Sequence, residues 1–356
     1  MPPTFRMKFD IKDEHLRSNW ASFFTRVALN PVIFMSNFQM DVQEGKPTFE
    51  ISIDQVGLED VKKRIEIRRK DGHYSMDINI KAFVDLPPSQ RGAHMSRSAE
   101  SIEECITEQI FSPKQSIEEF ASAIASGMLD KHAYATMSHV EIEGPFIIQG
   151  RPREGKASGQ SAYYVKCVVD ATRGCEGTGE HPCSIFLSAS ADGMIACPCG
   201  QEMSREFAKE MLLKREDLNL DTGSIDTILN VIPIATHNQR ATGTITMQVP
   251  EPGVIDVLDL IDAIVDSMSG RISGVLKRPD EALLIRLVHQ DPMFTEDVVR
   301  RMAWNVTGER FQNLPDDMKV TVKVVSYESI HPHQVSATKV STLGELRTAV
   351  SQVISQ

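Results

Sequence analysis

One cysteine pair and one histidine have the types and spacing of metal ligands. Residues 196–202 read ACPCGQE, with Cys197 and Cys199 on either side of a proline, and His237 follows in THNQR, residues 236–240. Thiolate sulfur and imidazole nitrogen suit a borderline-soft divalent metal, and the proline holds the two thiols in a stiff extended turn. The pattern indicates a metal site. The alternative is a pair of small buried hydrophobic side chains beside a surface histidine.

A second interpretation of the same cysteines is a structural zinc cluster. Cys175, His181 and Cys183 precede the pair and would supply further ligands. Zinc ribbons space their cysteines as Cys-x-x-Cys, whereas Cys197 and Cys199 are separated by one residue with no second copy. This cluster would make the chain a non-catalytic, zinc-stabilised binding protein, and that alternative stays open here.

Three other segments carry side chains that suit catalysis or anion binding. SYESIHPH, residues 326–333, offers His331 where a predicted strand ends, although a solvated loop histidine is the plainer interpretation. LKRPDE, residues 276–281, is by itself typical of the start of a charged helix. DLPPSQRGAHMSR, residues 85–97, is predicted to turn from a strand into a helix. There its backbone N–H groups and guanidinium groups would either bind phosphate or only cap the turn.

The elements that must position these segments follow from the periodicity of apolar residues. Strict alternation predicts strands, Asp71-Gly72 is a hairpin signal, and a capping box from Ser116 to Glu119 begins the second of two helices. The first half therefore has the order β-β-α-α-β-β, with strands at 62–69, 74–84, 140–143 and 163–169 and helices at 102–110 and 117–128.

The second half repeats this order more loosely. Strands are predicted at 184–189, 244–249, 318–324 and 335–340, and helices at 254–268, 295–306 and 343–353. Two tandem units of this kind predict an α+β architecture, in which antiparallel sheets carry helices on one face.

Length, composition and charge exclude several classes of protein. The chain has 356 residues, 41% hydrophobic and 24% charged, as in a globular protein with two domains or a duplicated module. With 38 basic and 49 acidic residues the net charge is −11, which disfavours a nucleic-acid partner. No apolar run approaches the roughly 20 residues that span a bilayer, and no signal peptide is evident. We therefore expect a cytoplasmic protein with no membrane partner.

Seven segments in this order resemble one protein family, the GTP cyclohydrolases of type IB and their archaeal relatives of the methanopterin (MptA) type. The segments are QVGLEDVKK, FVDLPPSQRGAHMSR, ACPCGQE, HNQR, LKRPDE, DPMFTED and YESIHPH, and the resemblance extends from about Asp41 to the C-terminus. In type IB proteins the Cys-Pro-Cys motif and HNQR lie close together, whereas Cys199 and His237 are 38 positions apart here. This separation and the sequences GMIACPCGQEMSR and GAHMSRSAE favour the MptA type.

The resemblance implies a bimodular tunnelling fold. Its two modules would be residues 40–183 and 184–356, and residues 1–39 would be an N-terminal extension outside the catalytic fold. The resemblance also implies a homodimer or homotetramer with active sites at the subunit interfaces.

Roles for individual residues are carried over from the family by motif. The implied metal ligands are Cys197, His237, Glu281 and His331. The implied catalytic residues are Cys197, His94 and Cys199, with Cys199 either a ligand or a bystander. Glu328 would anchor the guanine edge, since a carboxylate accepts two N–H bonds from the base. The implied phosphate-binding residues are Arg91, Arg97 and Lys277.

The implied reaction is metal-dependent hydrolysis of GTP, which opens the guanine imidazole ring at carbon 8 and releases formate. The resemblance favours Fe(II), with Zn or Mn as alternatives. The expected products are 7,8-dihydroneopterin 2′,3′-cyclic phosphate and pyrophosphate, the first step of a methanopterin-type pterin pathway. The type IB alternative gives 7,8-dihydroneopterin triphosphate for folate synthesis.

Overall fold

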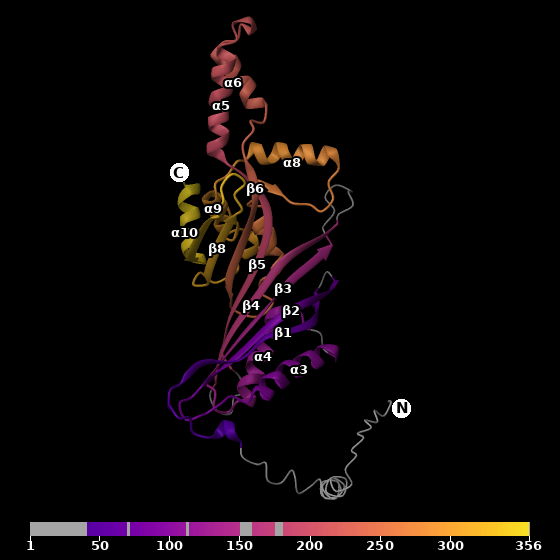
Figure 1. The fold of residues 1–356 in the computed structure, drawn as a ribbon, viewed down its shortest axis with the longest axis vertical. Coiled ribbons are helices and arrows are strands. Elements are labelled where there is room, and N and C mark those ends of the chain that lie inside the picture. Colours follow the sequence, from indigo (N-terminus) through magenta and orange to yellow (C-terminus); the bar gives the residue numbers. More distant parts are fainter. Residues whose placement is uncertain (1–40, 70–71, 112–113, 150–158, 175–180, 356) are drawn as a thin grey trace, which may run out of the picture. The chain divides into compact units, whose positions relative to one another are not determined.

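The structure is a computed structural model that describes residues 41–69, 72–111, 114–149, 159–174 and 181–355. Within these ranges the chain forms an antiparallel sheet of nine strands with helices packed against it (Figure 1). The predicted extension, residues 1–39, lies outside the described residues, as does Cys175.

The sheet is continuous across both halves of the chain. Its strands are ordered β1-β2-β3-β4-β5-β6-β8-β9, and β7 pairs with β5. The strands are β1 Ile53–Arg69, β2 Gly72–Leu86, β3 Met137–Gln149, β4 Gln160–Thr172, β5 Cys183–Ala196, β6 Asn238–Val249, β7 Gly270–Arg271, β8 Lys319–Ser326 and β9 Val335–Thr342. Because β4 pairs with β5, the predicted boundary between residues 183 and 184 falls at the start of a strand shared by one sheet.

Most of the helices lie between strands in the chain, and α10 follows the last strand. They are α3 Met95–Phe111, α4 Ile117–Lys131, α5 Pro198–Leu213, α6 Thr222–Val231, α7 Val257–Val265, α8 Arg278–Gln290, α9 Thr295–Asn305 and α10 Leu343–Ile354, with short turns η1 Val42–Glu44, η2 Glu216–Leu218 and η3 Glu309–Phe311. Helix α4 packs on β3 and β4, α7 on β5 and β6, and α9 on β8 and β9. Among the described residues, no helix has the length and apolar character needed to cross a bilayer.

One row of buried side chains explains why the helices share a face of the sheet. Residues that pair directly across neighbouring antiparallel strands point to the same face. The paired residues Ile80, Ile142, Cys167, Leu187, Met247 and Val320 cross six strands, and all are buried. The predicted α+β architecture of two tandem units with helices on one face is confirmed.

The first module follows the predicted β-β-α-α-β-β order, with one difference at its edge. Ser116 caps α4 by accepting a hydrogen bond from the Glu119 N–H, as the capping box predicts. Strand β1, however, begins at Ile53 rather than near Lys62. Two register shifts and a positive φ at Asp60 break the alternation there, so the first part of β1 carries no period of two.

The second module adds helices to the predicted order. Helices α5 and α6 fill the long separation between Cys199 and His237, and Figure 1 shows them standing side by side beyond the ends of β5 and β6. Helix α8 begins within LKRPDE, which is typical of the start of a charged helix, and continues to Gln290, beyond any helix predicted there. Its apolar residues Leu283, Ile285 and Leu287 are exposed, so it lacks the apolar stripe that predicts a packed helix.

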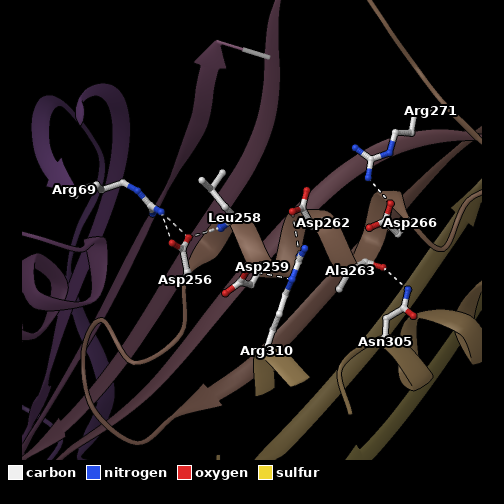
Figure 2. A network of polar contacts seen from close by, with 10 residues as sticks. All are labelled: Arg69, Asp256, Leu258, Asp259, Asp262, Ala263, Asp266, Arg271, Asn305 and Arg310. Carbon is white, nitrogen blue, oxygen red and sulfur yellow. Dashed lines mark hydrogen bonds and ion pairs between the residues drawn. The ribbon is translucent and has the colours of Figure 1, made fainter. Parts of the chain in front are cut away.

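Polar contacts join the two modules on the helical side of the sheet (Figure 2). Arg69, at the end of β1, binds the Asp256 carboxylate at 2.5 and 2.6 Å, and Asp256 caps α7. Within the second module, Arg310 in η3 binds Asp262 of the same α7 at 3.0 Å. Buried Glu118 of α4 accepts a hydrogen bond from the Gly253 N–H, and burial raises the pKa of this carboxyl group.

Residues 41–50 and 88–92 belong to a small unit of their own, which clusters separately from the rest of the described chain. Asp41 caps η1 by accepting a hydrogen bond from the Gln43 N–H at 3.1 Å. The backbone N–H groups of Arg91 and Gly92 both donate to the Gln43 carbonyl. The exposed Arg91 side chain therefore lies on a turn that backbone hydrogen bonds to Gln43 hold in place.

His132 lies fully buried after α4, and hydrogen bonds hold both of its ring nitrogens. The His94 backbone N–H donates to the Tyr134 hydroxyl, which is hydrogen-bonded to His132 Nδ1 at 2.8 Å. His132 Nε2 is hydrogen-bonded to Ser98 Oγ at 3.0 Å. Burial, reinforced by the positive charge of Arg97, lowers the pKa of His132 to about 4, so the ring is neutral at pH 7.

This pKa predicts that the protein loses stability in mild acid. Between pH 6.5 and 4 the unfolded chain binds a proton at His132 and the folded chain does not, so the free energy of unfolding falls as pH falls. The contribution of His132 amounts to about 2 kcal/mol between pH 7 and 5, at about 1.4 kcal/mol per pKa unit. Urea unfolding of the wild type and of His132→Gln at both pH values measures it.

His132→Gln should be less stable at pH 7 and should lose less stability on acidification. His73→Gln is the matched control, because His73 is exposed and should leave the wild-type pH dependence unchanged. An identical loss of stability in the wild type and in His132→Gln would contradict the prediction.

Candidate functional site

Cys197 lies where β5 ends and α5 begins. It is the N-cap residue of α5, Pro198 follows at the first helical position, and Cys197 Sγ accepts a hydrogen bond from the Gly200 N–H at 3.4 Å. A helix N-terminus leaves several N–H groups without helical partners, so a side-chain acceptor at this position is favourable. Cys199 lies in the first turn of α5, and its side chain is exposed.

His237 lies beside Cys197 although 40 positions separate them in the chain. The Cys197 N–H donates to the His237 carbonyl at 3.1 Å, and Thr236 Oγ1 donates to the Cys197 carbonyl at 2.9 Å. A Cβ atom built on Gly200 would lie 3.9 Å from Cys197 Sγ and 3.4 Å from His237 Cδ2. The thiol, the imidazole and Thr236 Oγ1 therefore all lie close to Gly200, where only a residue without a side chain fits.

A hydrogen-bond network fixes the His237 ring and connects it to Glu328. Gln239 Nε2 donates to Glu328 Oε1 at 3.1 Å and to Ser326 Oγ at 3.2 Å, so Gln239 Oε1 faces His237 Nδ1 at 3.1 Å. An amide oxygen only accepts, so His237 Nδ1 carries the proton and Nε2 keeps its lone pair. Ser326 Oγ also donates to Glu328 Oε1, at 2.7 Å.

These residues fit a divalent metal. A thiol and an imidazole lie near one glycine, and His237 Nδ1 is held by a side-chain oxygen, as is usual for metal-bound histidine. A thiolate, imidazole and carboxylate set suits both Fe(II) and Zn.

The other two predicted ligands lie farther away in the same chain. Glu281 is in the first turn of α8, eight residues before His289, or about 12 Å at 1.5 Å per residue. His331 is exposed in the loop between β8 and β9, where its ring stacks on His333 with centroids 5.2 Å apart. In the described part of one chain, no three of Cys197, His237, Glu281 and His331 have ligand atoms within 4.8 Å of one another.

The predicted residues of the first module lie at the opposite end of the sheet. Buried His94 is bonded to Tyr134, which precedes the start of β3, and that end of β3 aligns through β4 with Cys183. Cys197 follows the other end of β5, about 43 Å away over 13 steps of about 3.3 Å. Arg97 also lies at the His94 end and donates to the Lys131 carbonyl. The exposed Lys277 lies at the start of α8, near Glu281.

The same distance excludes the structural zinc cluster within one chain. Cys183 begins β5 and Cys197 follows its last residue, so their thiols cannot share one ion. Both ring nitrogens of His181 are engaged, one by the Gly174 N–H and one by Asp130. The alternative of a zinc-stabilised binding protein built on Cys175, Cys183, Cys197 and Cys199 is wrong for a single chain, and Cys175 lies outside the described residues.

Two residues that hold the predicted ones in place were not among the predicted site residues. Gln239 is buried and Ser326 fully so, and together they orient His237 and Glu328. Both lie inside segments singled out for other residues, namely THNQR and SYESIHPH. His237 and Gln239 are two positions apart on an extended segment, which places their side chains on one side and is the signal that could have identified Gln239.

Comparison with known proteins points to one family. The model of a family described as "GCHY-1: Type I GTP cyclohydrolase folE2" matches residues 40–337. A protein of Methanosphaera stadtmanae named GTP cyclohydrolase MptA is 38% identical over 308 residues, 86% of this chain and 96% of that protein. Proteins with the same name are 36% identical in Methanococcoides burtonii, over 87% of this chain and 96% of that protein, and in Methanocaldococcus jannaschii, over 87% and 97%.

Among solved structures, a uricase from Bacillus fastidious aligns with 85% of this chain and 97% of its own, with a TM-score of 0.47 and 8% sequence identity.

The close approach at Gly200 predicts a specific defect in Gly200→Ala. The new methyl group would meet Thr236 Oγ1 at 2.7 Å, so Thr236 must give up its bond to the Cys197 carbonyl or the 232–237 segment must shift. We expect a loss of about 1–2 kcal/mol in the free energy of unfolding and weaker Co(II) binding. Urea unfolding and Co(II) titration followed by absorbance measure the two effects.

Gly274→Ala is the matched control, because a Cβ atom there would have nothing within 4 Å. It should bind Co(II) as the wild type does. Equal Co(II) affinity in Gly200→Ala and Gly274→Ala would show that the surroundings of Gly200 are not part of a metal site.

Proposed function

Because the chain belongs to the type I GTP cyclohydrolase family, we propose that it opens the imidazole ring of GTP by hydrolysis at carbon 8 and releases formate. The observation that carries this proposal is the network from His237 through Gln239 to Glu328. It joins a candidate metal ligand to a candidate base anchor through one buried amide, so both are held at a fixed separation. Activity in the cytoplasm is part of the proposal.

The proposed metal ligands are Cys197, His237, Glu281 and His331, with Fe(II) favoured and Zn or Mn as alternatives. A divalent metal bound by this set would activate water for attack on carbon 8. The chain's own contribution is orientation. Gln239 keeps the proton of His237 on Nδ1 and so directs the lone pair of Nε2 toward the site.

Glu328 is the proposed anchor of the guanine edge. Its Oε1 atom accepts bonds from Ser326 and Gln239, which fix the plane of the carboxylate. Each carboxylate oxygen has two lone-pair sites, so Glu328 keeps acceptor capacity for two N–H groups of the base. A base held there would present its imidazole ring at a set distance from His237.

The proposed site draws on two chains. Cys197 and His237 lie at one end of β5, and His94 and Arg97 lie about 43 Å away at the other end. In a symmetric dimer or tetramer, the Cys197 end of one chain can meet the His94 end of its partner. His94 and Cys199 then act as catalytic side chains, and Arg91, Arg97 and Lys277 bind the phosphates.

The proposed products are 7,8-dihydroneopterin 2′,3′-cyclic phosphate and pyrophosphate, for a methanopterin-type pathway. Support comes from the relatives, which carry the name MptA, and from the long segment between Cys199 and His237. The type IB product, 7,8-dihydroneopterin triphosphate, is the other outcome of the test.

We predict that the protein incubated anaerobically with Fe(II) and GTP releases one formate per GTP and shows the phosphorus NMR signals of pyrophosphate and a cyclic phosphodiester. An intact triphosphate pattern would support the type IB product instead. Absence of formate with Fe(II), Zn and Mn would contradict the proposed function.

Glu328→Gln serves as the matched variant in that assay. The amide offers one acceptor atom where the carboxylate offers two, so KM for GTP should rise at least tenfold while Co(II) affinity stays within twofold of the wild type. Loss of Co(II) binding with an unchanged KM would assign Glu328 to the metal instead of the base.

The two-chain site predicts complementation between inactive variants. Cys197→Ala and His94→Ala, each inactive alone, should regain about a quarter of wild-type activity when mixed in equal amounts and refolded together, because half of the dimers are mixed and each has one intact site. Formate release measures it. Cys197→Ala mixed with His237→Ala is the control and should stay inactive. Equal inactivity of both mixtures would contradict a shared site.

A further inference from the structure

One side chain of α5, Gln201, contacts two segments that carry proposed metal ligands: the segment before β6, which ends at His237, and helix α8, which carries Glu281. Gln201 Nε2 donates to the Ile234 carbonyl at 3.1 Å and to the His289 carbonyl at 2.6 Å. Ile234 lies three residues before His237, and His289 lies in the last turn of α8, the helix that carries Glu281. Gln201 itself donates its backbone N–H to the Cys197 carbonyl, so it is one helical turn from that ligand.

Both carbonyls are ones that secondary structure leaves without a partner. The last four carbonyls of a helix lack intrahelical donors, and His289 is one of them. Residues 233–237 lie in neither a helix nor a strand, so the Ile234 carbonyl has no partner from a helix or a neighbouring strand. An amide NH₂ group has two protons, and here each is donated to a different segment.

The same two segments also lie against each other at the His289 ring. His289 Nδ1 donates to the Ile285 carbonyl within α8 at 2.7 Å, and Nε2 lies 3.4 Å from the Thr236 carbonyl. Met293, just beyond α8, donates its N–H to the Ala196 carbonyl at the end of β5. The end of α8 therefore lies against the 232–237 segment and is bonded to the end of β5. Gln201 bonds to α8 and to the 232–237 segment.

We propose that Gln201 is a positioning residue for the metal site, which fixes the segments bearing His237 and Glu281 relative to Cys197. This inference rests on the metal site of the proposed function. Gln201 binds no metal itself. Its loss leaves every ligand in the chain but lets the segments that carry two of them move relative to the third.

The test is Co(II) titration of the full chain, with the thiolate-to-cobalt absorption band as the signal. Gln201→Met keeps the length of the side chain and removes both N–H groups, so Co(II) should bind 10- to 100-fold more weakly. The thiolate band should persist at saturation, because Cys197 is unchanged. With saturating metal, kcat should fall while KM for GTP stays within twofold, because Glu328 is held separately.

Arg205→Met is the matched control. Arg205 lies one turn farther along α5 and bonds to the Leu229 carbonyl and to Asn230, so it joins α5 to α6 without touching the ligand-bearing segments. It should lose stability to urea as Gln201→Met does, yet bind Co(II) within twofold of the wild type.

Gln201→Glu is a second variant for the case that Gln201→Met does not fold. It has equal size, but its carboxylate donates nothing at neutral pH, so Co(II) binding should weaken at least as much. Wild-type Co(II) affinity in either folded variant, or equal weakening in Arg205→Met, would overturn the positioning role alone. A wild type without a thiolate-to-cobalt band would overturn the metal site of the proposed function and this inference with it.

Discussion

The pairing of β5 with both of its neighbours is the constraint on which the rest of the molecule depends. β5 pairs with β4 from Cys183 to Ser190 and with β6 from Ile185 to Ala196, so it is bonded along its whole length. Alternate residues such as Leu187 and Ala189 are buried under the helices, which makes a shift in register costly. The strand is therefore fixed in register, and the residues at its two ends stay far apart within one chain.

At the Cys197 end, side-chain amides replace backbone pairing. The 232–237 segment has no strand partner before β6 begins, and Thr236 and Gln201 hold it by bonds to backbone carbonyls. Gln239 likewise holds two side chains, His237 and Glu328, by hydrogen bonds. Gln239 is buried, and a buried donor without an acceptor would lower the free energy of unfolding by about 1–3 kcal/mol. Gln201 and Thr236 therefore hold the backbone of this segment, while Gln239 separately holds the two side chains.

The sequence predicted local structure well and distances poorly. Alternation from Tyr74 to Val84 identified β2, and the Ser116 capping box identified the start of α4, because both signals arise from neighbours in the chain. Nothing in the spacing of Cys183 and Cys197 reveals that one strand joins them. The sequence therefore allowed a shared zinc ion, which the structure excludes within one chain. Gln239 and Gln201 escaped notice because an amide becomes informative only once its partners are known.

Charge gives a physical reason why the proposed reaction would need a second chain. The chain has a net charge of −11, and Arg91 and Lys277 are exposed, as is the adjacent Arg278. Two unit charges 4 Å apart interact by only about 1 kcal/mol in water but several-fold more strongly near a protein surface that excludes it. Cations that face solvent would hold a triphosphate weakly and would do little to stabilise a departing pyrophosphate. If a partner chain covers them as proposed, desolvation strengthens the same charges where the leaving group forms, so assembly and the choice of product are linked.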